Sequence, residues 1–223
     1  MLAIKNINVD LAGNRILRDV NVTLEQSTTV GIVGHNGAGK TTLLRTIMGL
    51  VTPVSGQIFL GDVDLTSTPA HLRTSHGIGY SPEDRVIFPT MSVRENLMMP
   101  CEVLGQSDTQ IQQRLESVLE TVPELKEMLN RSGAALSGGQ GKMVALGRAL
   151  MVGTTLLLLD EPFQGLAPRL AQVYTEALSR LKLVQPELCV VITESNVKLL
   201  SDIPDKILEI ERGSIRSNTT TEV

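Results

Sequence analysis

The segment "VGIVGHNGAGKTTLL", residues 30–44, joins a short apolar run to a stretch with helical periodicity. Residues 34–41 within it have the spacing G-x-x-x-x-G-K-T, which is typical of a loop that binds phosphate between a strand and a helix. Glycines let backbone N–H groups converge on phosphate oxygens, and the N-terminus of the helix adds positive potential. Lys40 supplies a mobile positive charge and Thr41 a hydroxyl for Mg²⁺. The segment therefore predicts a phosphate-binding strand, loop and helix.

Apolar runs on both sides of this unit predict strands that alternate with helices. Residues 2–9 and 16–24 alternate apolar and polar side chains, as half-buried strands do. The four leucines at 156–159 and the apolar run 188–192 are typical of strands covered on both faces in a parallel sheet. A helix is expected from Pro168 to about Val184, because proline suits the first turn of a helix. This order predicts the α/β fold class.

A helical region interrupts the strand pattern in the middle of the chain. In "QIQQRLESVLETV", residues 110–122, one apolar stripe repeats at helical spacing and predicts contact with a core. We expect a single domain over residues 1–223, with a core lobe of residues 1–82 and 154–215, an inserted helical lobe of residues 83–153 and a frayed polar tail of residues 216–223.

Composition limits the function classes that fit the chain. The formal net charge of -4 argues against nucleic acid as the main partner, because affinity for nucleic acid rests largely on neutralising phosphates. Cys101 and Cys189 show no metal-type spacing and are expected to be reduced thiols in a cytosolic setting. The longest apolar tracts are much shorter than the roughly 20 residues that a membrane-spanning helix needs.

Two acidic residues follow the leucine run. Asp160 is expected at the carboxyl edge of the sheet, near Lys40, where it can hold Mg²⁺ directly or through water. Glu161 is the candidate that positions and deprotonates the attacking water, because phosphoryl transfer needs an oriented nucleophile beside the metal. Alone, "DEP" would read equally well as a turn at the end of a strand. Its combination with Lys40 favours the catalytic interpretation.

The segment "LSGGQ", residues 136–140, places two adjacent glycines at the start of an expected helix, where glycine costs backbone entropy. Ser137 is a good helix N-cap, and the two glycines let an anion approach the backbone N–H groups closely. Alone, a double glycine before a helix is more often a loop hinge. Together with the two motifs above, it predicts a second place where phosphate binds.

In order and approximate spacing, residues 34–42, 136–140 and 156–162 resemble the motifs of ATP-binding cassette (ABC) proteins, and the resemblance covers nearly the whole chain. It implies a P-loop NTPase fold of the ABC ATPase type, with a RecA-like core, an antiparallel β subdomain and an inserted helical subdomain. It also implies ATP and Mg²⁺ as cofactors, and a dimer in which each "LSGGQ" segment contacts the ATP held by a second ATPase subunit.

The resemblance assigns roles to individual positions. The expected ATP contacts are Leu11, Gly34, His35, Asn36, Gly37, Ala38, Gly39, Lys40, Thr41 and Thr42 within one chain, and Ser137, Gly138, Gly139 and Gln140 from the other chain. The expected catalytic residues are Lys40 and Glu161. The expected ligands of Mg²⁺ are Thr41, Glu83 and Asp160.

Four positions depart from the usual pattern of the family. Glu83 replaces a glutamine that links the Mg²⁺ site to the membrane subunits, although glutamate is characteristic of part of the subgroup. Ser195 replaces a switch histidine that touches the γ-phosphate, which predicts slower or asymmetric hydrolysis because a serine hydroxyl is shorter and does not titrate. Leu11 replaces an aromatic residue that stacks on adenine, which predicts weaker base selectivity. Ala167 replaces a common aspartate.

Two segments narrow the subgroup. "YSPEDRVIFPTMSVRENL", residues 80–97, and "EPFQGLAP", residues 161–168, resemble the ATPases of bacterial branched-chain amino-acid and urea importers. This implies transmembrane permease subunits as partners, a second ATPase that is identical or not, and a peripheral location on the cytoplasmic face of the inner membrane. Glu83 and Arg94 would transmit the closing and reopening of the ATPase dimer to the permease. Met91, Met98 and Met99 are interpreted either as an exposed docking surface or as core residues.

Three alternatives remain from the sequence. The chain could be a soluble cassette ATPase that acts as a nucleotide-dependent switch, although no second cassette or extra domain supports this. A DNA-repair cassette would need long coiled coils, which the pattern lacks. A binding-only cassette that has lost turnover is suggested by Leu11 and Ser195.

Overall fold

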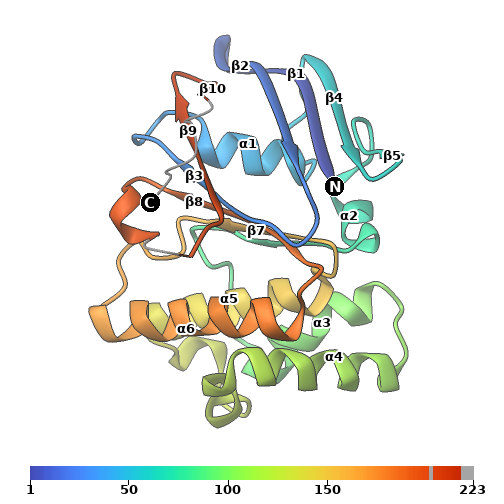
Figure 1. The fold of residues 1–223 in the computed structure, drawn as a ribbon. Coiled ribbons are helices and arrows are strands. Elements are labelled where there is room, and N and C mark those ends of the chain that lie inside the picture. The colour runs from blue at the N-terminus through green and yellow to red at the C-terminus, as the bar shows by residue number, and fades with distance from the viewer. Residues whose placement is uncertain (201–202, 217–223) are drawn as a thin grey trace.

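The computed structural model of the 223-residue chain describes residues 1–200 and 203–216 (Figure 1). Its elements are β1 (Leu2–Leu11), β2 (Asn14–Leu24), β3 (Thr29–Val33), α1 (Lys40–Ile47), β4 (Ser55–Leu60), β5 (Val63–Asp64), α2 (Ala70–Arg73), β6 (Ile78–Ser81), α3 (Val93–Val103), α4 (Asp108–Thr121), α5 (Gly138–Val152), β7 (Leu156–Asp160), α6 (Pro168–Val184), β8 (Cys189–Glu194), β9 (Lys206–Glu211) and β10 (Ser214–Arg216).

The larger sheet has the strand order β10-β9-β3-β8-β7-β6. Its strands are parallel, except that β9 and β10 form an antiparallel hairpin. Strand β7 is buried along its whole length. Leu156 and Leu158 belong to the core beneath α1, whereas Leu157 and Leu159 belong to the core shared with α5 and α6. The predicted α/β fold with a sheet covered on both faces is confirmed.

The smaller sheet is antiparallel, with the order β2-β1-β4-β5. Helix α1 lies between the two sheets (Figure 1) and packs Leu43, Leu44 and Ile47 into their shared core. Gly49, which follows the C-cap Met48, has φ 77°, a conformation that glycine adopts readily at the end of a helix. Packing on both sides fixes the position of α1, and thereby of the loop that precedes it.

Arg73 secures the end of α1 from inside the protein. This residue is only 1% exposed, and its guanidinium donates to the carbonyls of Thr46 (3.0 Å) and Ile47 (2.6 Å). It also donates to the carbonyls of Leu65 (2.6 Å) and Thr68 (2.8 Å). Helix carbonyls that would otherwise be buried without a partner are thus satisfied.

Helices α3, α4 and α5, like α6, lie on the side of the larger sheet that faces away from the antiparallel sheet (Figure 1). Each begins with a serine in a capping box, formed by Ser92, Ser107 and Ser137. The stripe predicted in residues 110–122 faces the core: Ile111, Leu115, Val118 and Val122 are buried, and Leu119 is half-buried. The lobe boundaries at 82/83 and 153/154 stay predictions.

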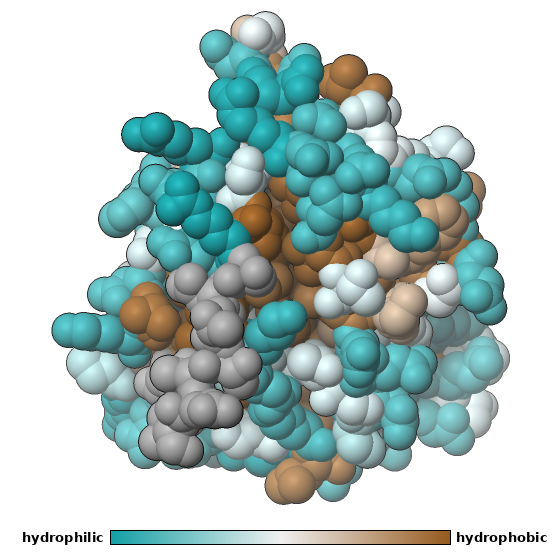
Figure 2. All heavy atoms as spheres, turned by 45° about the horizontal axis from the view of Figure 1, so that its top comes forward, coloured by the Kyte–Doolittle hydropathy of each residue, from teal (hydrophilic) through white to brown (hydrophobic). Residues whose placement is uncertain are grey.

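Three smaller expectations can be compared with the structure. Arg216 is part of β10 rather than of a tail, and the remainder of the predicted tail, residues 217–223, lies outside the described residues. Met91, Met98 and Met99 are half-buried, so they do not form a fully exposed surface. Within residues 1–200 and 203–216, no helix is long and apolar enough to cross a membrane. The face in Figure 2 is hydrophilic around its rim, with hydrophobic residues gathered toward its centre.

Candidate active site

A cavity of about 340 Å³ lies where β3 and β7 end and α1 begins. The carboxyl edge of a parallel sheet is the usual place for a ligand in α/β proteins. The described residues that line the cavity are Ile16, Asn36, Gly37, Gly39, Lys40, Thr41, Thr42, Glu83, Glu161 and Gln164.

The loop from Gly34 to Gly39 turns the chain from β3 into α1. Gly37 and Gly39 have φ values of 82° and 112°, in the left-handed region that favours glycine. A side chain on Gly37 would meet no atom within 4 Å, so this backbone is open to the cavity. His35, Asn36 and Gly37 are exposed, whereas Ala38 is buried against the core. The loop therefore presents its backbone to a ligand, as phosphate binding requires.

Lys40 lies in the floor of the cavity and is 4% exposed. Its Nζ donates to the carbonyls of Gly34 (2.6 Å) and His35 (3.2 Å). The same Nζ lies 3.0 Å from Oε1 of Glu161. The two predicted catalytic side chains, which are 121 residues apart in sequence, are therefore in direct contact.

Asp160 stands at the end of β7 and is 2% exposed. Its Oδ1 accepts hydrogen bonds from the hydroxyls of Thr41 (3.2 Å) and Thr193 (2.8 Å), and its Oδ2 accepts one from Tyr80 (3.3 Å). Burial raises the pKa of Asp160, against the lowering effect of these hydrogen bonds. A nearby cation would favour the ionised carboxylate.

The oxygen donors fit Mg²⁺. The Thr41 hydroxyl contacts the Asp160 carboxylate, and Glu83 lines the same cavity. Burial raises the pKa of Glu83, and the charges of Glu161 and Asp160 raise it further. Among the described residues, no group of three or more His, Cys, Asp or Glu side chains forms a complete metal cage. Mg²⁺ that binds together with nucleotide phosphates usually takes one or two protein oxygens and completes its shell with phosphate oxygens and water.

Glu161 sits in an unusual backbone conformation, with φ 44°. Non-glycine residues rarely adopt this region, and surrounding contacts must hold them there. The Glu161 N–H donates to the carbonyl of Thr193 (3.1 Å) and to its hydroxyl (3.2 Å). The Glu161 carbonyl accepts a hydrogen bond of 2.7 Å from Nζ of Lys142. Strand β8 and helix α5 thus fix the peptide groups on both sides of Glu161.

The segment Ser137–Gln140 begins α5. The Ser137 N–H donates to Oε1 of Gln140 (3.0 Å), and the Gln140 N–H donates to Oγ of Ser137 (3.3 Å). A side chain on Gly139 would collide with Leu170 of α6, so this glycine has a packing role as well. None of residues 137–140 lines the cavity described above. The segment is therefore placed away from its own chain's phosphate loop.

The residue predicted to contact adenine and the residue at the predicted switch position do not line the cavity. Leu11, at the end of β1, is 40% exposed, and Ser195 follows β8 and is half-buried. Neither is among the residues that line the cavity, and an adenine contact by Leu11 stays a prediction. Ile16, on β2, lines the cavity with an apolar side chain. Sequence reasoning gave no role to Ile16, which belongs to no recognised motif, or to Gln164, although Gln164 lies within the segment 161–168 that resembles importer ATPases.

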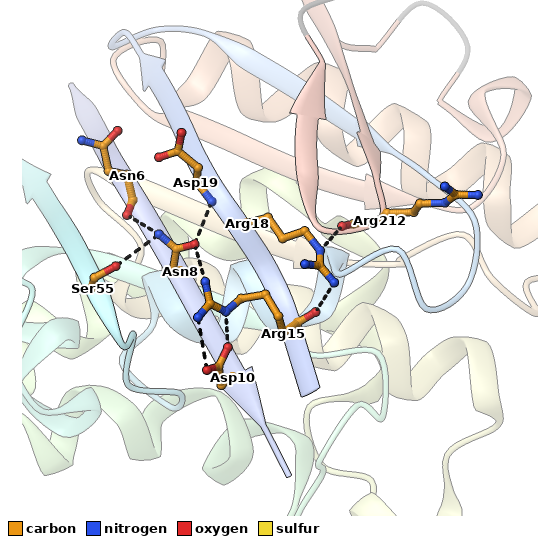
Figure 3. A network of polar contacts seen from close by, with 8 residues as sticks. All are labelled: Asn6, Asn8, Asp10, Arg15, Arg18, Asp19, Ser55 and Arg212. Atoms are coloured by element: carbon orange, nitrogen blue, oxygen red, sulfur yellow. Dashed lines mark hydrogen bonds and ion pairs between the residues drawn. The ribbon is translucent and has the colours of Figure 1, made fainter. Parts of the chain in front are cut away.

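A second cleft, of about 430 Å³, shares Ile16 and Gly37 with the first. Its other lining residues are mostly charged: Arg15, Arg18, Glu211, Arg212, Ser214 and Arg216. Figure 3 shows Arg15 pointing toward Asp10 and Asn8, and Arg18 donating to two backbone carbonyls. The cleft extends the phosphate-loop cavity with a basic wall.

Comparison with known proteins identifies relatives over the full chain. The ABC transporter family model matches residues 17–164. The probable branched-chain amino acid transport ATP-binding protein LivF of Archaeoglobus fulgidus is 33% identical, covering 99% of this chain and 92% of its own. BraG of Pseudomonas aeruginosa, a high-affinity branched-chain amino acid transport ATP-binding protein, is 34% identical, and the match covers 99% of this chain and 93% of BraG. The lipopolysaccharide export system ATP-binding protein LptB of Haemophilus influenzae is 33% identical over 100% and 91%.

Solved structures show the same fold. An ATP-binding cassette of an ABC transporter in its ADP conformation is 25% identical, has a TM-score of 0.81 and covers 97% of this chain and 89% of its own. A dimeric cassette in a post-hydrolysis state, bound to ADP and Pi, is 21% identical with a TM-score of 0.83, over 99% and 100%.

Proposed function

This chain belongs to the ABC transporter family as an ATP-binding subunit that hydrolyses ATP, and we propose that it powers the uptake of branched-chain amino acids, urea or a similar small solute. The similarity to LivF and BraG over 99% of the chain carries this proposal. The resemblance of residues 80–97 and 161–168 to importer ATPases supports it independently. On this view, permease subunits select the solute and the chain works on the cytoplasmic face of their membrane.

Lipopolysaccharide export is the second candidate. It is favoured by the LptB proteins of Haemophilus influenzae and Escherichia coli, which are 33% and 32% identical over all of this chain. Both candidates use the same ATPase chemistry and differ in the membrane partners.

In the proposed mechanism, residues 34–42 hold the phosphates of ATP. Backbone N–H groups around Gly37 and the N-terminus of α1 face the anion, and Lys40 neutralises it. Phosphate oxygens compete with Glu161 for the Lys40 ammonium, so ATP binding releases the glutamate carboxylate. Bound Mg²⁺, held by Thr41 and Asp160 with Glu83 nearby, would neutralise charge on the transferred phosphoryl group.

Glu161 then acts on water. Its carboxylate lines the cavity, and its backbone is held on both sides by Thr193 and Lys142. A fixed carboxylate beside the phosphate loop can orient a water molecule and accept its proton. Thr193 also holds Asp160 through its hydroxyl, so one residue of β8 positions both acidic side chains.

The contact with ATP on a second subunit and the place of the adenosine are further parts of the proposal. Residues 137–140 lie outside the chain's own cavity and are exposed or half-buried, which suits contact with ATP on a second ATPase subunit. The adenosine end of ATP would lie toward Ile16 and the basic cleft, since that cleft continues the cavity past Gly37.

A reconstitution experiment tests the function. The chain is affinity-captured with its membrane subunits, and the complex is placed in vesicles with ATP inside and labelled leucine or labelled urea outside. We expect ATP-dependent solute accumulation that is lost in the Lys40→Ala variant. Capture of lipopolysaccharide-export subunits, with no amino-acid or urea uptake, would establish the second candidate. ATP hydrolysis with no membrane partner would favour the soluble switch.

A further inference from the structure

Lys142 joins the two functional segments of the chain. It lies on α5, just beyond Ser137–Gln140, and its Nζ donates to the carbonyl of Glu161 at 2.7 Å. Helix α5 begins with the residues proposed to contact ATP on the partner. Glu161 belongs to the cavity of the chain's own ATP. A single side chain therefore connects the start of the signature helix to the catalytic glutamate.

The contact acts at a backbone position that needs support. Glu161 has φ 44°, a backbone conformation that non-glycine residues rarely adopt and that surrounding contacts must hold in place. Thr193 holds its N–H, and Lys142 holds its carbonyl. If the carbonyl contact is lost, the peptide group after Glu161 can rotate, and the direction of the Glu161 side chain changes with it.

The charge around Lys142 explains why a lysine suits this position. Glu194 on β8 is fully buried, and its Oε2 has no hydrogen-bond partner among the described residues. The charged groups that act on the Lys142 ammonium are Glu194, Glu83, Arg85 and Glu161. The three acids favour the Lys142 ammonium, whereas burial and the charge of Arg85 disfavour it.

We propose that Lys142 is a positioning residue that couples the signature segment to Glu161. When α5 shifts on contact with a partner's ATP, Lys142 transmits the shift to the Glu161 carbonyl. The carboxylate of Glu161 is thereby aligned for hydrolysis only when the signature segment is engaged. The inference rests on the proposed roles of Glu161 and residues 137–140.

Kinetics of Lys142 variants of the purified full-length chain test the proposal. We expect Lys142→Met to lower the single-turnover rate of phosphate release from MgATP at least tenfold, with the Kd for ATP changed less than twofold, because the phosphate loop is untouched. Lys142→Arg keeps the charge and a donor and should recover part of the rate. Lys126→Met, an exposed lysine in the same helical region, should behave as the unaltered protein does.

A double-variant cycle separates positioning from general damage. In a Glu161→Gln background, adding Lys142→Met should change the remaining rate less than twofold, because residues that act as a unit are strongly non-additive. A tenfold loss in both backgrounds would overturn the proposal, as would a normal rate for Lys142→Met. If instead Glu161→Gln retains normal hydrolysis, the role of Glu161 itself is wrong. Urea unfolding of each variant shows whether Lys142→Met is folded, and Lys142→Gln replaces it if it is not.

Discussion

Nζ of Lys40 lies 3.0 Å from Oε1 of Glu161, and both side chains are almost fully buried. The residue expected to bind phosphate is thus paired with the residue expected to activate water. The pair must separate before either can act on ATP, because Oε1 of Glu161 and the Lys40 ammonium already bond to each other. Nucleotide binding and activation of the glutamate are therefore linked by the geometry of one ion pair.

This relationship predicts the behaviour of Glu161→Gln. The glutamine keeps the size of the side chain and removes the charge that competes for Lys40, so ATP binding should be retained or tightened. Hydrolysis should fall by roughly 10²-fold or more, because general base catalysis is lost. Equilibrium binding of labelled ATP and single-turnover phosphate release measure the two effects. In the presence of ATP the variant should also stay dimeric in size-exclusion chromatography. If the variant hydrolyses ATP at the normal rate, Glu161 is not the general base.

A second prediction concerns Arg73. Its guanidinium donates to the backbone carbonyls of residues 46, 47, 65 and 68, and the first two of these belong to the end of α1. Arg73→Met should lower the free energy of unfolding by about 3 kcal/mol or more, because several buried carbonyls lose their partner. Arg73→Lys should recover little, since lysine lacks the planar set of five donors. Urea denaturation measures both variants. Arg94→Met, a half-buried arginine outside this network, serves as the control.

The replacement of the switch histidine predicts a gain in activity. Ser195 follows β8 directly and is half-buried, so a longer side chain there has room to turn outward. Ser195→His should raise steady-state ATP turnover of the assembled complex several-fold by adding a longer, titratable side chain at the position of the family's switch histidine. The Glu161→Gln, Ser195→His double variant should remain inactive. Unchanged turnover in Ser195→His would show that the serine does not limit hydrolysis.

Local patterns were enough to predict the elements that carry the motifs. The helix predicted from Pro168 to about Val184, on the preference of proline for a first helical turn, spans Pro168–Val184 in the structure, and the leucine run forms a strand buried on both faces. These features depend on neighbours in sequence. The glycine spacing likewise fixed the place of the phosphate loop, because few other residues tolerate the φ values of Gly37 and Gly39.

Residues that support the site were not predictable from local pattern. Thr193, Tyr80 and Lys142 hold Asp160 or Glu161 from distant parts of the chain. Their contacts arise when α5, β6 and β8 pack around β7, and nothing in the periodicity of these segments signals a polar partner. The same holds for Arg73, whose buried guanidinium has no sequence signature. Lys142 lies just beyond the "LSGGQ" segment, but the spacing alone gave it no role.

The last prediction follows from Glu194, whose Oε1 accepts a hydrogen bond from the Phe163 N–H (2.9 Å) while its Oε2 has no partner among the described residues. Burial raises the pKa of Glu194 to about 7, from an ordinary value of 4.5. The folded protein therefore holds this proton more tightly than the unfolded chain does. Stability from this group is full below pH 4.5 and is lost as the pH rises through 7, by about 3 kcal/mol.

Glu194→Gln, which is neutral at every pH, should remove that loss. Urea unfolding at pH 5 and pH 8 measures the difference, with the exposed Glu127→Gln as control. If the variant and the unaltered protein lose the same stability between these pH values, the pKa of Glu194 is not raised in the folded protein and the prediction is wrong.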